Sequence, residues 1–337
     1  MTQEKTANEA GRNGTTVRIG TRSSPLALWQ AEHVRSLLET GHPGVKIELV
    51  RISTAGDRDR NSPLAAVGGM GLFTKEIQRA LMDEQVDIAV HSLKDLPTAA
   101  PDALTLGAIP PRELAFDSLI SPKYRTLQDL PKGARVGTSS LRRKAQLLNI
   151  RPDLIVEPIR GNVETRLNRA SDADMAAVIL AQAGLTRLGL IGHETEALVP
   201  PRFLPAVGQG ALGIECRVAD QRTRQLLAPL NDAPTRAAVL AERHLLRLLE
   251  GGCMIPLSAW GRSDAPGRLR LTGRVFSPDG DRMVEAEAEA GIQDPESLGA
   301  TVAELLLKKG AAELLRMNPT GGRIGTSDAQ PGPSPTQ

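Results

Sequence analysis

The feature that most constrains the fold is an alternation of strand and helix patterns from residue 17 to residue 181. Pro25 suits the first turn of a helix, and Leu28, Val34 and Leu38 recur on one face of it. The predicted strands are Val17–Thr21, Val45–Ile52, Val86–His91, Arg135–Thr138, Leu154–Ile159 and Ala176–Ala181, and the predicted helices are Pro25–Thr40, Leu72–Glu84, 140–150 and 162–172. This β-α-β order predicts parallel sheets with helices on both faces.

The C-terminal part has a different pattern. A long helix is expected over Thr235–Glu250, because Gly251 and Gly252 are typical of a helix end. Three antiparallel strands are expected near 256–263, 267–277 and 282–292, and a last helix near 296–316. The order predicts a small α+β domain. At roughly 100–200 residues per domain, the 337-residue chain holds two or three domains.

Charge and composition exclude some partners. The net charge is only +2 and aromatic residues make up 2% of the chain, so binding of nucleic acid by base stacking is not expected. Arginine outnumbers lysine 32 to 9. Either a coding bias or a site for small polyanions explains this excess, since the guanidinium group grips carboxylates with two parallel bonds.

Cysteine usage and hydropathy indicate which cellular compartment to expect for this protein. Two cysteines, Cys216 and Cys253, cannot form a disulfide framework, and a reducing cytosol fits them. Residues 1–14 are polar, so no secretory signal is expected, and no apolar run is long enough for a membrane span. Residues 1–14 and 318–337 are expected to be disordered tails.

The segment Ile88–Pro97 is the first that carries chemistry. A buried type of strand leads directly into His91, Ser92, Lys94 and Asp95. Ligands of open α/β sheets usually bind beyond the carboxyl ends of the strands, where these polar residues lie. The alternative is an ordinary strand exit with a capping Asp.

Three further strand-to-helix turns pair hydroxyl groups or free amides with arginine. In Val136–Arg143, the residues Thr138, Ser139 and Ser140 open a helix that begins with Arg142 and Arg143. Free N–H groups at a helix start form an anion cradle, although a simple Ser cap with two solvated arginines is the alternative. The other two turns are Ile159–Arg166, with Arg160 and Arg166, and Arg18–Trp29, with Arg22, Ser23 and Ser24. Three such turns predict one basic cleft shared by two α/β domains.

Cys253 lies in the irregular turn Glu250–Pro256, just after the long helix. It is either an inert buried cysteine or a reactive one. A helix C-terminus carries partial negative charge and does not lower a thiol pKa, so reaction needs an arginine or a strong electrophile. Cys216, within the strand-like Leu212–Cys216, is typical of a core. The glycine loop Gly68–Phe73 fits neither nucleotide-binding pattern, and no metal signature is present.

These segments, in this order and spacing, resemble the porphobilinogen deaminase family over roughly residues 16–316, as do Ile179–Gly189 and Leu204–Ala211. The resemblance implies an α/β fold with two domains like those of periplasmic binding proteins and a small C-terminal α+β domain that carries the cofactor cysteine. The implied boundaries are 15–110 plus 211–228, 116–204 and 233–317. It implies a cytoplasmic, monomeric enzyme without nucleic-acid or membrane partners.

The resemblance also implies the reaction. The family condenses four porphobilinogen molecules head to tail on a covalent dipyrromethane and releases ammonia and hydroxymethylbilane. Carried over, Cys253 holds the dipyrromethane through a thioether. Asp95 is the catalytic carboxylate, which stabilises the azafulvenium cation left when the substrate loses its amine. The residues expected to bind the acetate and propionate groups are Arg22, Ser24, Lys94, Thr138, Ser139, Ser140, Arg142, Arg143, Arg160, Arg166 and Arg187.

The chain departs from the family pattern at two places. The family often has lysines where Ala66 and Met70 stand, and Arg58 and Arg60 are the nearby cations. The family also favours an arginine where this chain has Phe116. Neither departure removes Asp95 or Cys253.

Two other functions are weighed against the enzyme. A two-domain α/β protein can bind a carboxylate ligand without chemistry, but it needs neither a third domain nor Cys253. A nucleic-acid binder would use the arginine excess and would show a steep salt dependence.

Overall fold

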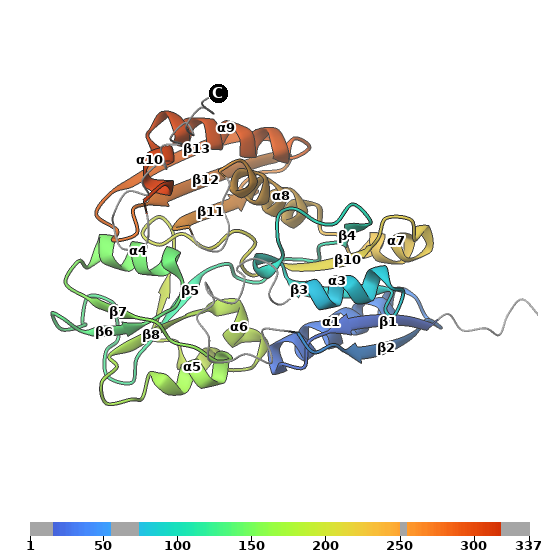
Figure 1. Ribbon diagram of the computed structural model, residues 1–337, viewed down its shortest axis with the longest axis horizontal. Helices are drawn as coiled ribbons and strands as arrows, with labels where there is room; N and C mark the ends of the chain where they lie inside the picture. Colours follow the sequence, from blue (N-terminus) through green and yellow to red (C-terminus); the bar gives the residue numbers. More distant parts are fainter. Residues whose placement is uncertain (1–15, 55–73, 250–254, 318–337) are drawn as a thin grey trace, which may run out of the picture.

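Three β-sheets organise the molecule, which we describe from a computed structural model. The structure describes residues 16–54, 74–249 and 255–317. Two five-stranded sheets lie side by side beneath a three-stranded sheet (Figure 1). Within the described ranges, no helix combines the length and apolar character needed to cross a membrane.

The first sheet has the strand order β2-β1-β3-β10-β4. One face is covered by α1 and α7 and the other by α3, because Val34 and Leu227 pack with Ile88 while Leu81 packs with Ala89 on the opposite side of β3. Its elements are β1 (Thr16–Thr21), α1 (Pro25–Gly41), β2 (Lys46–Arg51), α3 (Lys75–Met82), β3 (Ile88–Ser92), η1 (Leu93–Asp95), β4 (Leu104–Ala108), β10 (Leu212–Arg217), α7 (Gln221–Leu227) and η3 (Ala228–Leu230).

The second sheet repeats this plan with the order β7-β6-β8-β5-β9. Leu147 of α4 packs on one face, and Leu167 of α5 with Leu185 of α6 packs on the other. Its elements are β5 (Asp117–Ile120), β6 (Arg135–Gly137), α4 (Leu141–Ile150), β7 (Ile155–Glu157), α5 (Val163–Arg169), β8 (Ala177–Ala181), α6 (Gln182–Arg187), η2 (Ile191–His193) and β9 (Glu196–Leu198).

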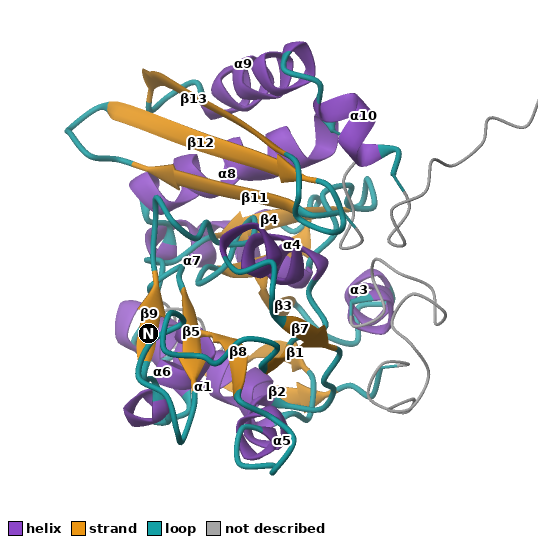
Figure 2. Ribbon diagram, turned by 90° about the vertical axis from the view of Figure 1, so that its left-hand side faces the viewer, coloured by secondary structure: helices purple, strands orange, loops and turns teal. Residues whose placement is uncertain are grey.

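The third sheet is antiparallel, with the order β11-β12-β13. Its apolar face is covered by two helices whose Leu245 and Val302 share one core with Leu271. The elements are α8 (Ala233–Leu248), β11 (Leu257–Arg262), β12 (Arg268–Phe276), β13 (Met283–Gly291), α9 (Pro295–Lys308) and α10 (Ala311–Leu315). Figure 2 shows this sheet above the two larger units. The predicted fold class, α/β with a small C-terminal α+β part, is thereby confirmed.

The prediction of parallel sheets is wrong for part of each large sheet. β1, β2 and β3 are parallel, as are β6, β7 and β8. However, β10 runs antiparallel between β3 and β4, and β5 runs antiparallel between β8 and β9. β5 and β10 follow the two connections between the large sheets. The chain therefore enters each of these strands from the other unit rather than through a covering helix.

The predicted last helix is two helices. α9 ends at Lys308 and α10 begins at Ala311, with Gly310 between them at φ 96°. A left-handed residue stops an α-helix, and glycine adopts it without a steric penalty. The 3.6-residue periodicity continues across this stop because Leu306 and Leu314 belong to the same core.

A buried carboxylate joins the third sheet to both connections. Glu242 of α8 accepts hydrogen bonds from Arg112 Nη1 at 2.6 Å and from the backbone N–H groups of Gly208 at 2.7 Å and Gly261 at 2.8 Å. Its side chain is fully buried. Nearby, the ring of Trp260 on β11 meets the edge of Phe116, with centroids 5.9 Å apart.

Candidate active site

The buried strand β3 ends at the predicted catalytic segment. Ile88, Ala89 and Val90 are apolar and buried because β3 lies between β1 and β10 and is covered on both faces. The chain then turns through η1, where Lys94 is partly buried and Asp95 is exposed. Asp95 thus lies at the carboxyl end of a central strand, as predicted.

Lys94 reaches into a group of opposing charges. Burial lowers the pKa of its ammonium group to about 8; the charge of Asp95 acts against this lowering and that of Arg143 adds to it. Lys94 Nζ also lies 3.4 Å from Gln209 Oε1. Lys94 therefore loses its proton at a lower pH than an ordinary lysine, although it stays mostly charged at neutral pH.

Asp117 holds the two arginines that open α4. Asp117 Oδ2 lies 2.7 Å from Arg142 Nη2, and Arg143 donates to Asp117 Oδ1 through Nε at 3.0 Å and Nη2 at 2.7 Å. Burial alone would raise the pKa of the Asp117 carboxyl, but the two guanidinium groups lower it to about 2. All three side chains are buried. Arg142 and Arg143 are therefore partly neutralised by the protein itself.

Of the other nitrogen atoms of these two arginines, some donate to backbone carbonyls and one lacks a hydrogen-bond partner in the part of the chain that the structure describes. Arg142 Nη1 donates to the carbonyl of Leu204 at 2.7 Å, and Arg143 Nη1 donates to that of Ile179 at 2.9 Å. Arg142 Nε is buried and has no hydrogen-bond partner among the described residues. One buried donor of Arg142 is thus unpaired among the described residues.

The predicted hydroxyl residues form the start of α4. Ser140 caps the helix by accepting from the N–H of Arg143 at 3.4 Å, and Thr138 Oγ1 accepts from the N–H of Ser140 at 3.3 Å. Ser139 Oγ donates to the carbonyl of Ile159 at 2.6 Å. These bonds tie the turn after β6 to the neighbouring strand exit that leads to Arg160.

Arg166 on α5 belongs to the same charge group. Burial, Arg143 and Arg160 all lower the pKa of its guanidinium, while the charge of Asp95 raises it. Its Nε is buried and finds no hydrogen-bond partner within the described part of the chain. Residues from both large sheets, Asp95 from one and Arg166 from the other, therefore share one electrostatic site.

Two predicted residues lie where β1 meets α1. Ser24 is the N-cap of α1 and accepts from the N–H of Ala27 at 3.3 Å. Arg22 is partly buried two residues before this cap.

Arg187 contacts the connection between the large sheets instead. Its Nη2 donates to the carbonyl of Gly210 at 2.6 Å, and its guanidinium lies 5.7 Å from the ring centroid of Trp29. Burial lowers the pKa of Arg187 to about 10, with Glu113 acting against the lowering.

Several predicted features lie outside the described residues. These are Cys253, the glycine loop Gly68–Phe73, and the departures at Ala66 and Met70 with Arg58 and Arg60. Cys216 is described, and it is a buried core residue of β10 as predicted.

Two residues of the site escaped the sequence reasoning. Asp117 stands alone at the start of a short strand, without a motif around it. Gln209 is buried and donates to the carbonyl of Ala115 at 2.6 Å and to Asp117 Oδ1 at 3.0 Å. A signal for Gln209 existed, because a polar residue between Gly208 and Gly210 indicates a constrained turn, and both glycines have positive φ.

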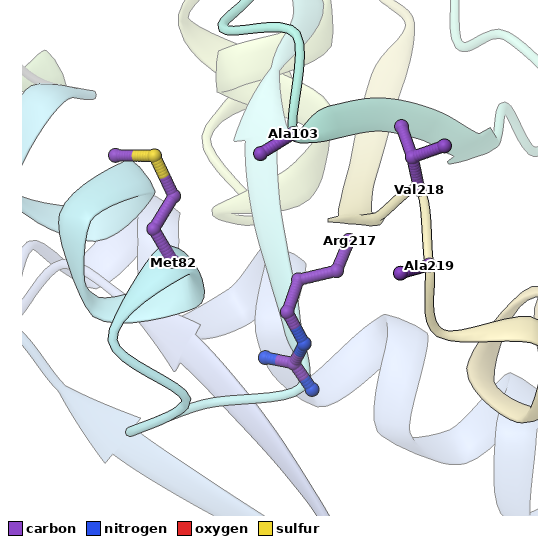
Figure 3. A pocket seen from close by; sticks show the side chains of 5 residues that line it. All are labelled: Met82, Ala103, Arg217, Val218 and Ala219. Atoms are coloured by element: carbon purple, nitrogen blue, oxygen red, sulfur yellow. The ribbon is translucent and has the colours of Figure 1, made fainter.

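The described residues also line two small hollows. One, of about 320 Å³, is lined by Met82, Ala103, Arg217, Val218 and Ala219 (Figure 3). The other, of about 230 Å³, lies between Pro200–Leu204 and the outer face of the third sheet, beside Trp260 and Arg262. Neither includes a predicted site residue.

Comparisons with known proteins agree over most of the chain. The family model described as "Porphobilinogen deaminase, dipyromethane cofactor binding domain" matches residues 17–225, and "Porphobilinogen deaminase, C-terminal domain" matches residues 236–308. A porphobilinogen deaminase of Syntrophotalea carbinolica is 50% identical over 90% of this chain and 96% of the relative. One of Acidithiobacillus ferrooxidans is 52% identical over 89% and 97%.

Solved structures of low sequence identity also match in part. A nutrient binding protein from Burkholderia cenocepacia, solved bound to methionine, is 14% identical, with a TM-score of 0.40. The match covers 63% of this chain and 89% of that protein.

Proposed function

This chain belongs to the porphobilinogen deaminase family, and on that premise we propose how its own residues perform the family's reaction. The enzyme condenses four porphobilinogen molecules stepwise on a covalently attached dipyrromethane and releases ammonia and hydroxymethylbilane. The assignment of roles to particular residues is our proposal.

Asp95 is the proposed catalytic carboxylate. The observation that carries this role is its place at the end of buried β3, where its charge acts on both Lys94 and Arg166. Loss of ammonia from the substrate leaves positive charge on a pyrrole ring. A fixed carboxylate beside the ring stabilises that charge and accepts or returns a proton at its oxygen.

The arginine group fits a ligand rich in carboxylates. Arg142 Nε and Arg166 Nε are buried donors without a hydrogen-bond partner in the described ranges. A buried unpaired donor is costly, and a carboxylate oxygen would satisfy it. The dipyrromethane supplies the pyrrole on which the product chain is built. The proposed set that binds its acid groups and those of the substrate is Arg22, Ser24, Lys94, Thr138, Ser139, Ser140, Arg142, Arg143, Arg160, Arg166 and Arg187.

Within this set the residues have different parts. Arg142, Arg143 and Arg166 bind carboxylates directly, while Ser139 and Ser140 hold the turn in shape through the bonds described above. Arg187 has one nitrogen engaged by Gly210, so its other donors serve the ligand. Cys253 is the proposed attachment point of the cofactor through a thioether.

The division into domains is also proposed. The sheets and their separate cores support domains over 15–110 plus 211–228, 116–204 and 233–317. A cytoplasmic protein without nucleic-acid partners is proposed from the cysteine usage, the low aromatic content and the net charge. A monomer is proposed from the resemblance to the family.

The deciding experiment is the mass of the denatured protein with a peptide map. We expect an adduct of two porphobilinogen units less two ammonia on Cys253, and none in Cys253→Ser. Asp95→Asn should fold normally, judged by circular dichroism, and turn over at least about 100-fold more slowly. Full activity of Asp95→Asn would exclude the catalytic role, and an adduct on another residue would move the attachment site.

A further inference from the structure

An arginine of the third unit grips the backbone that carries Asp95. Arg243 lies on α8, and its Nη1 donates to the carbonyl of Leu96 at 2.8 Å while its Nη2 donates to that of Pro97 at 2.6 Å. The side chain is 8% exposed. Both accepting carbonyls belong to the two residues that directly follow Asp95.

The same face of α8 packs on this turn. Val239 lies one helical turn before Arg243 and shares a buried cluster with Leu93 and Leu96. Residues four apart lie on one face of a helix, so Val239 and Arg243 contact the segment together. The 3-10 turn is short: the N–H of Leu96 donates to the carbonyl of Leu93, and the N–H of Leu93 donates to the carbonyl of Ala211 on the neighbouring connection. A 3-10 turn has poorer hydrogen-bond geometry than an α-helix, so contacts from outside the turn matter for its position.

A buried carboxylate influences Arg243 electrostatically. Burial lowers the pKa of Arg243, and the charge of Glu215 on β10, which is fully buried, acts against this lowering. Glu215 Oε2 lies 3.0 Å from His91 Nε2, and Gln78 Nε2 donates to Glu215 at 3.1 Å. β10, through Glu215, and α8, through Arg243, thus contact the two ends of the segment between His91 and Pro97.

We infer that Arg243 is a positioning residue that fixes the Asp95 turn against α8, the helix that leads to Cys253 ten residues later. The inference rests on the proposed catalytic role of Asp95. Helix α8 then both holds the turn that carries Asp95 and leads in sequence to Cys253, the proposed attachment residue. Bidentate donation to two adjacent carbonyls needs the planar guanidinium fork, which lysine lacks.

The test compares Arg243→Gln with Arg247→Gln, in preparations whose cofactor content is counted by denatured mass. Arg247 is exposed on the same helix, contacts His244, and provides the same change in charge. We expect kcat per loaded molecule to fall about 10- to 100-fold in Arg243→Gln, since misplacement of a reacting group by about 1 Å has effects of this size. KM should change less than about 2-fold, because the guanidinium of Arg243 is buried and donates to the backbone carbonyls of Leu96 and Pro97. The kcat of Arg243→Lys should lie between the values for the wild type and for Arg243→Gln.

The outcomes separate this inference from the role of Asp95. An inactive Asp95→Asn with an Arg243→Gln as active as Arg247→Gln overturns the inference alone. A fully active Asp95→Asn removes the catalytic role and the inference with it. In the double variant, the Arg243→Gln change should add little to the effect of Asp95→Asn, and independent, multiplying effects would contradict action through Asp95. If Arg243→Gln does not fold, Arg243→Lys carries the test, and full kcat in it overturns the inference.

Discussion

At the scale of single residues, the site depends on a carboxylate that no sequence motif marks. Asp117 forms ion pairs with both Arg142 and Arg143, and its charge offsets the repulsion between the two buried arginines. Removing one partner of a buried ion pair leaves an uncompensated charge, which is more costly than losing the attraction itself.

Asp117→Asn should therefore lower the free energy of unfolding by about 3–5 kcal/mol at neutral pH, measured by urea denaturation. The control is Asp172→Asn, which removes a half-exposed pair with Arg169 and should cost less than about 1 kcal/mol. Equal effects of the two substitutions would contradict the part we assign to Asp117.

The pH dependence of stability should identify the same group. The pKa of Asp117 is lowered from 3.8 to about 2 in the folded protein, so the unfolded chain takes up this proton first as the pH falls. The stabilisation is present above pH 3.8 and is lost as the pH falls through about 2. We expect about 2–3 kcal/mol of the stability of the wild type to disappear over this interval, and that portion of the loss to be absent from Asp117→Asn.

The pKa of Lys94 reports the electrostatic effect of Asp95. Its pKa of about 8 is supported against burial by the negative charge of Asp95. Reductive ¹³C-methylation followed by NMR titration should give a value near 8 for this lysine, and a lower one in Asp95→Asn. Asp172→Asn should leave it unchanged. An unaltered titration in Asp95→Asn would mean that the two charges do not interact.

At the scale of elements, the sequence predicts the long helices well, but it predicts short strands and strand direction poorly. The periodicity of Leu28, Val34 and Leu38 predicted α1 within one residue at its end, because one buried stripe determines a helix. The strands β4, β5 and β9 were missed, since segments of three to five residues are too short to show a period. The direction of β10 could not be predicted either, because strand direction depends on partners distant in sequence.

The site shows the same division between what is local and what is not. The turns with Ser140 and Ser24 were predictable, since a cap and its helix are neighbours in the chain. The pairing of Arg143 with Asp117 spans 26 residues, and the grip of Arg243 on Leu96 spans 147. No sequence pattern within either segment indicates which distant residue it contacts.

The stop between α9 and α10 can be tested by substitution. Gly310→Ala places a side chain at φ 96° with no neighbour within 4 Å, so only backbone strain opposes it. We expect a loss of about 1–2 kcal/mol in thermal or urea unfolding. Gly41→Ala, at the helical end of α1 and equally unobstructed, should be stabilising by about 0.4–1 kcal/mol. A neutral Gly310→Ala would show that the two helices can merge.

At the scale of the whole molecule, Glu242 links the third unit to both connections between the large sheets. Glu242→Gln leaves the largely buried Arg112 guanidinium without its counter-charge, and we expect a loss of about 3–5 kcal/mol in urea unfolding. Glu304→Gln, in an exposed pair with Lys308 on α9, is the matched control and should show no measurable change. If the two variants unfold alike, the buried link does not hold the units together.

The chain contains only two tryptophans, and each lies at a boundary between units. Trp29 of α1 faces Arg187 from the second unit, and Trp260 of β11 faces Phe116 in the connection. Their intrinsic fluorescence therefore reports on the two boundaries. With Trp29→Phe and Trp260→Phe, a stopped-flow fluorimeter can test separately whether each boundary changes during successive turnovers, without any added label.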